Sequence, residues 1–219
     1  MLSDVKTIIF DFDGTLHESI RIYAPAFRKA YAYLVNEGHV EDRHWSDEEI
    51  SAWLGYSPLD MWKNFLPELE KSVREKASLI IRDEMSSLLH AKMGRLYDGA
   101  IGVLEYLKSR GYLLVFLSNC RESYKDAVRD IYGLDKYFVE FITTEAHGFK
   151  PKHQIVREIK DRLDQEILII GDRLQDIEAG FLNDIETIAC RYGYGKEEEF
   201  ILANHIIDDI RELLKAADI

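Results

Sequence analysis

Cysteine and proline are both scarce in this sequence, and each shortage narrows the class of protein. The 219 residues include two cysteines, Cys120 and Cys190, which lie far apart and form no C-x-x-C pair. Such spacing favours reduced thiols in a cytosolic protein over a disulfide framework. There are four prolines, no low-complexity runs and no repeat of fixed period, so a disordered chain or a repeat architecture is not expected.

Basic residues are also few relative to acidic ones. Lysine and arginine together number 28, against 40 for aspartate and glutamate, which gives a formal net charge of −12. A surface of that sign repels nucleic-acid backbones and anionic membranes, so neither is an expected partner. It repels free phosphate as well, and a phosphate-binding site in this chain therefore needs a local cation.

Long hydrophobic runs are absent too. No apolar stretch approaches the roughly 18 residues that a membrane span needs, and the first residues, MLSDVK, lack the basic start and apolar stretch of a signal peptide. Hydrophobic residues nevertheless make up 47% of the chain, which is enough to build a real core. We therefore expect a folded cytoplasmic protein, of a length that suits one domain carrying an insertion.

Short apolar segments recur along the chain, and a helical pattern follows most of them. Their continuous apolar character predicts buried strands, and their alternation with helices predicts a parallel sheet that is covered on both faces. The expected fold class is therefore α/β, a doubly wound parallel sheet of the Rossmann-like kind. The predicted strands are residues 7–12, 112–119, 138–144, 166–172 and 186–193, and the predicted helices begin at residues 99, 123, 152 and 174.

Residues 16–94 interrupt this alternation. Apolar residues with helical spacing dominate the stretch, and no strand is predicted in it. Within it, Ser46 and Glu49 have the spacing of a capping box at the start of a helix. The expected domains are a core of residues 1–15 and 95–219 and an inserted all-helical cap of residues 16–94.

Two pairs of carboxylates stand at the ends of predicted strands. Asp11 and Asp13 follow the first strand, where residues two apart point the same way. Asp172 ends a later strand, and Asp176 follows four residues on, where i and i+4 of a helix share a face. Either pair alone also suits an acidic turn or helix start, but two such strand ends together favour a metal site. Oxygen ligands of this kind suit Mg²⁺ better than a transition metal.

Two further strand ends carry groups that can hold a phosphoryl group. Ser118 and Asn119 end a strand just before a predicted helix and offer hydroxyl and backbone N–H donors. Lys150, in the segment TTEAHGFKPK, would supply the local cation. Each of these residues alone is more often a solvated surface residue, but together with the carboxylates they form a constellation that suits a phosphate ester.

The order of these segments resembles the haloacid dehalogenase-like hydrolase superfamily, in its phosphoglycolate phosphatase-like branch with an α-helical (C1-type) cap. DFDGTL matches the first motif of that family, LSN the second, the lysine of FKP the third and GDRLQD the fourth. The likeness extends over essentially the whole chain. It implies a phosphoric monoester hydrolase with Mg²⁺ as cofactor and a small phosphorylated metabolite as substrate.

The resemblance also implies a role for each motif residue. Asp11 would be the nucleophile that forms an aspartyl-phosphate, and Asp13 would protonate the leaving alcohol and then activate the water. The side chains of Asp11 and Asp172 and the backbone carbonyl of Asp13 would bind Mg²⁺, with Asp176 behind it or bound through water. The residues that would hold the phosphoryl oxygens are Ser118, Asn119 and Lys150.

Several alternatives remain open at this stage. Dehalogenases lack the second aspartate, so Asp13 argues against carbon–halogen chemistry, whereas phosphomutases share all four motifs. A catalytically silent phosphate-binding regulatory protein usually breaks a motif aspartate, and none is broken here. His153 and Asp98 stand where such phosphatases often have proline, which leaves the substrate open among phosphoglycolate, pyrophosphate, nucleotide monophosphates and sugar phosphates. We expect a monomer or a homodimer.

Overall fold

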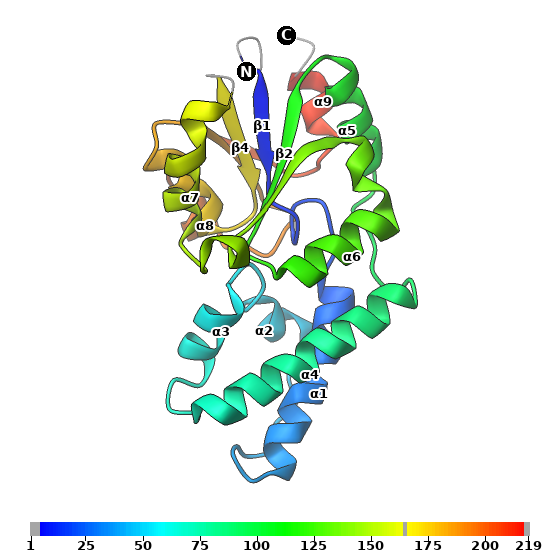
Figure 1. The fold of residues 1–219 in the computed structure, drawn as a ribbon, viewed down its shortest axis with the longest axis vertical. Coiled ribbons are helices and arrows are strands. Elements are labelled where there is room, and N and C mark those ends of the chain that lie inside the picture. Colours follow the sequence, from blue (N-terminus) through cyan, green and yellow to red (C-terminus); the bar gives the residue numbers. More distant parts are fainter. Residues whose placement is uncertain (1–4, 164–165, 217–219) are drawn as a thin grey trace.

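A parallel sheet organises the structure. The computed structural model describes residues 5–163 and 166–216, and these residues form a six-stranded sheet in the order β3-β2-β1-β4-β5-β6, in which neighbouring strands are parallel (Figure 1). The first strand of the chain is therefore central, with β2 and β4 on either side. The strands are β1 (Thr7–Phe10), β2 (Leu113–Ser118), β3 (Phe138–Thr143), β4 (Ile167–Gly171), β5 (Glu186–Cys190) and β6 (His205–Ile207).

The predicted fold class is confirmed, and the structure adds one strand to it. Each predicted strand corresponds to one of β1 to β5. The additional strand, β6, is three residues long and pairs with β5 at the edge of the sheet. Ile207 is buried there while Ile206 is exposed. Because β6 has no long apolar run, no pattern in the sequence predicts it.

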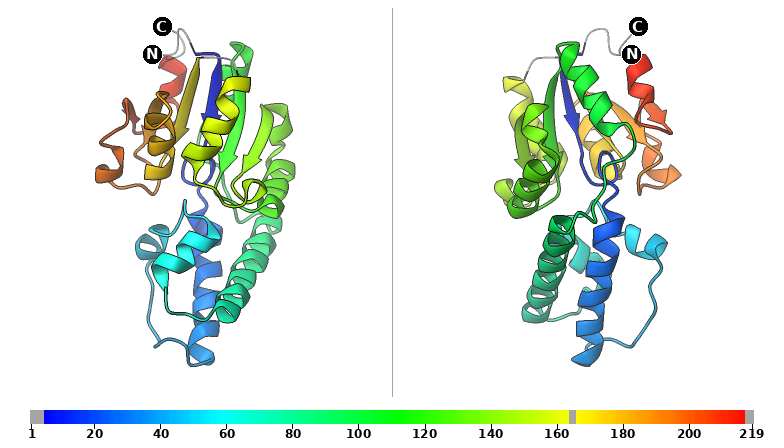
Figure 2. Two further views of the ribbon diagram at one scale, coloured as in Figure 1. Left: turned by 60° about the vertical axis from the view of Figure 1, so that its left-hand side comes forward. Right: turned by 90° about the vertical axis from the view of Figure 1, so that its right-hand side faces the viewer.

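Helices cover both faces of the sheet. Successive side chains of a strand point to opposite faces, so Ile8 and Phe10 of β1 pack on one side and Ile9 packs on the other. The first side contacts α5, α6 and α9, and the second contacts α7 and α8 (Figure 2). These helices are α5 (Ala100–Ser109), α6 (Glu122–Tyr132), α7 (Lys152–Ile159), α8 (Leu174–Phe181) and α9 (Glu212–Ala216). The connections between helices and strands also contain the short 3₁₀ helices η1 (Leu134–Lys136), η2 (Glu145–His147) and η3 (Lys160–Arg162), and η4 (Glu197–Phe200) lies between β5 and β6.

The helices between β1 and α5 gather at the carboxyl ends of the strands (Figure 1). Here α1 and α4 run side by side, and these helices enclose buried apolar residues of their own, among them Phe27, Trp62 and Ile81. We call this helical unit the cap. Its helices are α1 (Ile20–Asn36), α2 (Asp47–Ser51), α3 (Pro58–Phe65) and α4 (Lys71–His90). In the part of the chain that the structure describes, no helix is both long enough and apolar enough to cross a membrane.

The predicted capping box is present at the start of α2. The backbone N–H of Glu49 donates to Oγ of Ser46 at 3.2 Å, and the backbone N–H of Ser46 donates to Oε2 of Glu49 at 2.9 Å. Two donors that a helix start leaves unsatisfied are thus bonded reciprocally, which explains why so short a helix begins where the sequence predicts it.

Two chain segments join the cap to the sheet, and they pair with each other. The N–H of Glu18 donates to the carbonyl oxygen of Arg95 at 2.8 Å, and the N–H of Tyr97 donates to that of Leu16 at 2.9 Å. The outgoing and returning segments therefore lie side by side, directly beyond the end of β1.

Gly180 of α8 lies where the helix packs closely against the sheet. A Cβ atom at this position would collide with the side chain of Thr187 in β5 and lie 2.7 Å from the carbonyl oxygen of Ile185. We expect Gly180→Ala to lower the free energy of unfolding by about 1–3 kcal/mol through overpacking. Gly102 of α5 has nothing within 4 Å of such an atom, so Gly102→Ala should raise that free energy by up to about 1 kcal/mol. Urea denaturation measures both changes, and equal effects would contradict the close contact.

Candidate active site

Three buried carboxylates meet at the carboxyl ends of β1 and β4. Asp11 follows β1 directly, Asp172 follows β4, and Asp176 lies in the first turn of α8. One oxygen of each lies within 4.8 Å of the others, and the residues are 5%, 0% and 2% exposed, respectively. The structure therefore brings together the side chains of three predicted metal ligands, while the side chain of Asp13 is bonded outside this cluster.

Close backbone contacts fix the position of Asp172. Gly14 has φ +94°, which favours glycine, and a Cβ atom there would collide with the Asp172 carboxylate. A Cβ atom on Gly193 would lie 2.6 Å from the carbonyl oxygen of Gly14. The backbone N–H of Tyr194 donates to Oδ2 of Asp172 at 2.7 Å. The loop after β5 therefore forms one wall of the carboxylate cluster.

The cation of the cluster is Lys152, whereas the sequence predicted Lys150. Nζ of Lys152 donates to Oδ1 of Asp11 and to Oδ1 of Asp176, each at 2.6 Å, and the residue is 3% exposed. Lys150 is exposed, and its ammonium pairs with Glu158 at 2.5 Å. The structure therefore corrects the predicted cation by two residues.

The position of Pro151 explains this correction. Pro151 is the N-cap residue of α7, so Lys150 remains in the preceding loop while Lys152 begins the helix. Ile155 and Val156 are buried three and four residues after Lys152, which is the spacing of one helical face. A lysine in phase with the apolar face of its helix is the sequence signal that identifies Lys152.

The single ammonium group of Lys152 does not neutralise three carboxylates, and the pKa values of Asp11 and Asp172 are raised in this buried cluster. Burial raises the pKa of Asp11 to about 7, against the opposing effect of Lys152. Burial and the charge of Asp11 raise the pKa of Asp172 well above its usual range. Burial disfavours a charged Lys152, but Asp11 and Asp176 outweigh that effect and raise its pKa. The cluster thus favours the uptake of further positive charge, either a proton or a divalent cation.

Asp11 and Asp172 are the carboxylates best placed to share a divalent cation. The Thr15 hydroxyl lies 3.4 Å from Oδ2 of Asp11 and 3.3 Å from Oδ1 of Asp172, between the two side chains. Asp176 uses Oδ1 for Lys152 and Oδ2 for a backbone N–H at the start of α8. Asp176 therefore orients the lysine and supports the site from behind.

Asp13 is held apart from the cluster by two side chains. Tyr124 donates its hydroxyl hydrogen to Oδ1 of Asp13 at 2.7 Å, and Nδ1 of His17 lies 3.2 Å from the same oxygen. The His17 ring is fully buried and stacks on Phe12 with centroids 5.1 Å apart, and its Nε2 lies 3.1 Å from the Tyr132 hydroxyl. A neutral imidazole protonated on Nδ1 donates to Asp13 and accepts from Tyr132, so it satisfies both contacts.

Ser118 and Asn119 lie at the carboxyl end of β2, beside Asp11 and Asp13. Ser118 is buried, and both residues line the same cavity as the two aspartates. Nδ2 of Asn119 donates to the carbonyl oxygen of Gly55 in the cap at 2.6 Å. The amide of Asn119 therefore ties the cap to the sheet, which leaves its backbone N–H as the group that can face a ligand.

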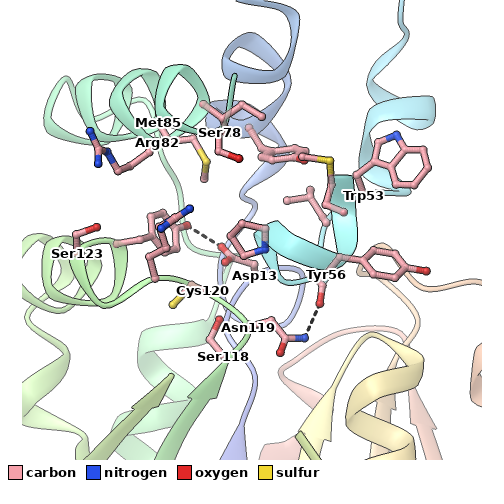
Figure 3. A pocket seen from close by; sticks show the side chains of 18 of the residues that line it. Asp13, Trp53, Tyr56, Ser78, Arg82, Met85, Ser118, Asn119, Cys120 and Ser123 are labelled. Carbon is pink, nitrogen blue, oxygen red and sulfur yellow. Dashed lines mark hydrogen bonds between the residues drawn. The ribbon is translucent and has the colours of Figure 1, made fainter. Parts of the chain in front are cut away.

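A cavity of about 240 Å³ opens between the sheet and the cap (Figure 3). Its floor contains Asp11, Asp13 and Ser118, and its roof comes from α3, α4 and the loop before α3. Figure 3 shows Asp13 inside the cavity, below Ser78 and Met85 of the cap. The Asp11 carboxylate beside Lys152 and the Asp13 carboxylate with its hydrogen-bond donors thus share one floor.

Known proteins share this combination of motifs and fold. The family model for the haloacid dehalogenase-like hydrolases matches residues 5–181. The chain belongs to this family. The phosphoglycolate phosphatase of Vibrio parahaemolyticus is 25% identical over 222 residues, which cover 97% of this chain and 96% of that protein. The phosphoglycolate phosphatase of Aquifex aeolicus is 28% identical over 198 residues, which cover 88% of this chain and 87% of that one.

The fold of this haloacid dehalogenase-like hydrolase is also shared. The crystal structure of a predicted phosphoglycolate phosphatase from Haemophilus somnus superposes with a TM-score of 0.82 and covers 99% of both chains at 22% sequence identity. The resemblance inferred from the motifs is therefore confirmed, and the relatives support an enzyme of the phosphatase kind that acts on a small phosphorylated compound.

Sequence reasoning missed several residues of the site, among them Lys152, Tyr124 and Tyr194. Lys152 is recognisable from its helical phase. Tyr124 and Tyr194 carry no motif signal, but they follow β2 and β5 at the same edge of the sheet as Asp11. In a parallel sheet the residues after every strand converge on that edge, so a search of all strand ends would have included them.

Lys152 should contribute to stability in a way that Lys150 does not. Lys152→Met leaves buried carboxylates without their ammonium partner, and we expect it to lower the free energy of unfolding of the metal-free protein by about 3 kcal/mol at pH 8. Because the pKa of Asp11 is raised above its unfolded value, its protonated form stabilises the fold at low pH, so the loss should shrink towards pH 5. Lys150→Met, the matched control, removes an exposed pair and should change little. Urea denaturation at pH 8 and pH 5 measures the free energy of unfolding of both variants. Equal losses for the two variants would contradict the assignment of Lys152 as the cation of the site.

Proposed function

We propose that this protein is a Mg²⁺-dependent phosphatase that hydrolyses a small phosphomonoester through an aspartyl-phosphate. The observation that carries the proposal is the position of Asp11, which lines the cavity and contacts Lys152 among buried carboxylates. Such a carboxylate has a cation beside it and a second carboxylate, Asp13, two residues away. A nucleophilic carboxylate, a neighbouring cation and a second carboxylate are the groups that nucleophilic attack on a phosphate ester requires.

The donor set fits a magnesium ion. Asp11 and Asp172 offer carboxylate oxygens on either side of the Thr15 hydroxyl, and the backbone carbonyl of Asp13 is an oxygen donor on the same loop. Oxygen ligands without nitrogen or sulfur suit Mg²⁺. When bound, the ion neutralises negative charge, so that a phosphate dianion can approach a carboxylate. Asp176 holds Lys152 and supports the site from behind.

The chain's own residues then carry the reaction. A carboxylate oxygen of Asp11 attacks phosphorus as the P–O bond to the alcohol breaks, and Asp13 gives its proton to the departing oxygen. Water next loses a proton to Asp13 and attacks the aspartyl-phosphate, which releases inorganic phosphate and regenerates the Asp11 carboxylate and the protonated Asp13. The Ser118 hydroxyl, the Asn119 backbone N–H and the Lys152 ammonium hold the phosphoryl oxygens during both steps.

We further propose that residues 16–94 move as a cap over a core of residues 1–15 and 95–219. Support comes from the separate apolar cluster inside the cap and from the two paired connecting segments, which give the cap a single joint. Opening admits the substrate, and closing excludes water from Asp11. We expect the enzyme to act on a cytoplasmic metabolite as a monomer or a homodimer.

Phosphate release tests the reaction. With Mg²⁺ and p-nitrophenyl phosphate, the wild-type protein should release phosphate, and the rate should fall to background with a chelator or in Asp11→Asn, because each removes an essential group. Malachite green detection of phosphate measures both. Release that survives Asp11→Asn would show that another group attacks phosphorus and would sink the proposed mechanism.

Metal binding needs a readout besides turnover. Mg²⁺ at about 100 times its dissociation constant should raise the free energy of unfolding by about 2.7 kcal/mol. Asp172→Asn removes one carboxylate donor and should abolish that gain. Asp184→Asn, an exposed aspartate outside the site, is the matched control and should keep it. Stabilisation that Asp172→Asn leaves unchanged would mean that the ion binds elsewhere.

Tyr124 should act as a positioning residue for Asp13. Burial raises the pKa of the Tyr124 hydroxyl well above its usual range, so the group stays a donor to Asp13. Without it, proton delivery to the leaving oxygen should be misaligned. We expect Tyr124→Phe to lower kcat/KM about 10- to 100-fold for an alkyl phosphate but only slightly for p-nitrophenyl phosphate, because nitrophenolate leaves without a proton.

Tyr132→Phe is the control for this prediction. Tyr132 contacts His17 but makes no hydrogen bond to Asp13 among the contacts of the described residues, so its loss should affect both esters weakly. A purely structural role of Tyr124 would instead reduce turnover of the two esters equally, and that result would reject the positioning role.

A further inference from the structure

We infer that the alcohol part of the substrate is an apolar, uncharged group, such as an aromatic ring or a branched aliphatic chain. The inference rests on the proposed phosphatase function and concerns the same cavity. It differs from what the names of the relatives suggest, because phosphoglycolate carries a carboxylate beside its phosphate. The apolar composition of the roof carries the inference, and the carboxylate partners of the two arginines at the cavity support it.

The roof of the cavity is built from apolar side chains. Leu54 and Pro58 come from the start of α3 and the loop before it, Met61 and Trp62 from α3 itself, and Met85 from α4. Figure 3 shows the Met85 side chain on the roof, opposite Asp13 and Ser118 on the floor. A group that leaves the phosphate at the floor therefore extends into apolar surroundings, which stabilise an apolar group and disfavour a charged one.

Two polar groups of the roof are bonded to each other. Nε1 of Trp62 donates to Oγ of Ser78 at 2.6 Å, so neither group needs the substrate as a partner. On the floor side, Asn119 uses its amide for the carbonyl oxygen of Gly55 at 2.6 Å. These three groups of the cavity therefore have hydrogen-bond partners without the substrate.

The cations at the cavity are all paired as well. Arg82 bonds to Asp83 at 2.7 Å and Arg121 bonds to Glu145 at 3.2 Å, and Lys152 lies deeper, between two carboxylates of the floor. Both arginines that line the cavity among the described residues thus already have a carboxylate partner. A substrate carboxylate would compete with that partner, in a chain whose net charge is −12.

The size of the cavity agrees with a substrate of modest bulk. Its volume of about 240 Å³ exceeds the roughly 150 Å³ of an engineered apolar cavity that binds benzene. The remainder accommodates a phosphoryl group over Asp11. Because the Asn119–Gly55 hydrogen bond already joins the roof to the floor, this volume describes a cavity with the cap in place.

Three alkyl phosphates separate the possibilities, because they share the reacting bond and differ in what the roof meets. Ethyl phosphate is small and uncharged, 2-phenylethyl phosphate adds a ring, and 2-phosphoglycolate adds a carboxylate. We expect kcat/KM for 2-phenylethyl phosphate to exceed that for ethyl phosphate by about 10- to 100-fold, the usual effect of burying a group of this size. We expect 2-phosphoglycolate to fall below ethyl phosphate.

Variants of α4 test whether the preference for 2-phenylethyl phosphate arises from the roof of the cavity. Met85→Ala removes part of the roof and should lower the ratio of kcat/KM for 2-phenylethyl phosphate to that for ethyl phosphate by about 3- to 10-fold. Leu79→Ala, on the same helix but with an exposed side chain outside the cavity, is the matched control and should leave the ratio unchanged. Met85→Lys introduces a cation into the roof and should raise the relative kcat/KM for 2-phosphoglycolate. Far-UV circular dichroism establishes that each variant is folded.

The outcomes distinguish this inference from the function on which it rests. If the protein releases phosphate from p-nitrophenyl phosphate but prefers 2-phosphoglycolate, or treats the ring no better than the ethyl group, the phosphatase function stands and the apolar substrate class is wrong. A ratio that Met85→Ala leaves unchanged would also overturn it. If no ester releases phosphate, the proposed function falls and this inference falls with it. Asp11→Asn with Mg²⁺ provides a binding check by calorimetry, in which 2-phenylethyl phosphate should bind more tightly than ethyl phosphate.

Discussion

The ammonium group of Lys152 is buried with three carboxylates, and the charge imbalance of this cluster governs what the site can do. Lys152 neutralises part of the charge of Asp11 and Asp176, while the pKa of Asp11 remains raised to about 7. Asp172 bonds instead to a backbone N–H of the loop after β5. A site in this state takes up positive charge readily, and a divalent cation would supply it without protonating Asp11, the proposed nucleophile.

The parallel sheet is what allows the fold to hold so much like charge in one place. β1 is central, with β2 and β4 beside it, so the residues after these strands converge although they are far apart in the sequence. Strands buried on both faces fix the backbone on which Asp11 and Asp172 stand. The packing of the whole core therefore offsets the unfavourable free energy of burying the carboxylates. A turn on a flexible surface could not hold them in these positions.

Sequence reasoning predicted the fold class, the cap and the carboxylate positions, because each follows from a strong periodic or strand-end signal. It missed β6, whose only buried residue is Ile207, and it assigned the cation to Lys150. Both features depend on the tertiary structure. The edge strand β6 forms only by pairing with its neighbour, and the start of α7 at Pro151 determines which lysine lies in the helix. The hydrogen bond from Tyr124 to Asp13 joins residues 111 positions apart, and no local pattern reports a contact of that range.

Arg173 links the cap to the carboxylate cluster. It stands between Asp172 and Asp176 in the sequence, and its guanidinium donates to the carbonyl oxygen of Leu54 and lies 5.3 Å from the centre of the Tyr56 ring. Both of these contacts belong to the roof of the cavity. If the cap opens as proposed, Arg173 loses its partners in the roof while the carboxylates on either side of it keep theirs in the core. The turn that carries these carboxylates thus also supplies a contact that holds the roof. In the proposed mechanism, the apolar roof that selects the alcohol and the charged floor that breaks its ester therefore come together only in the closed enzyme.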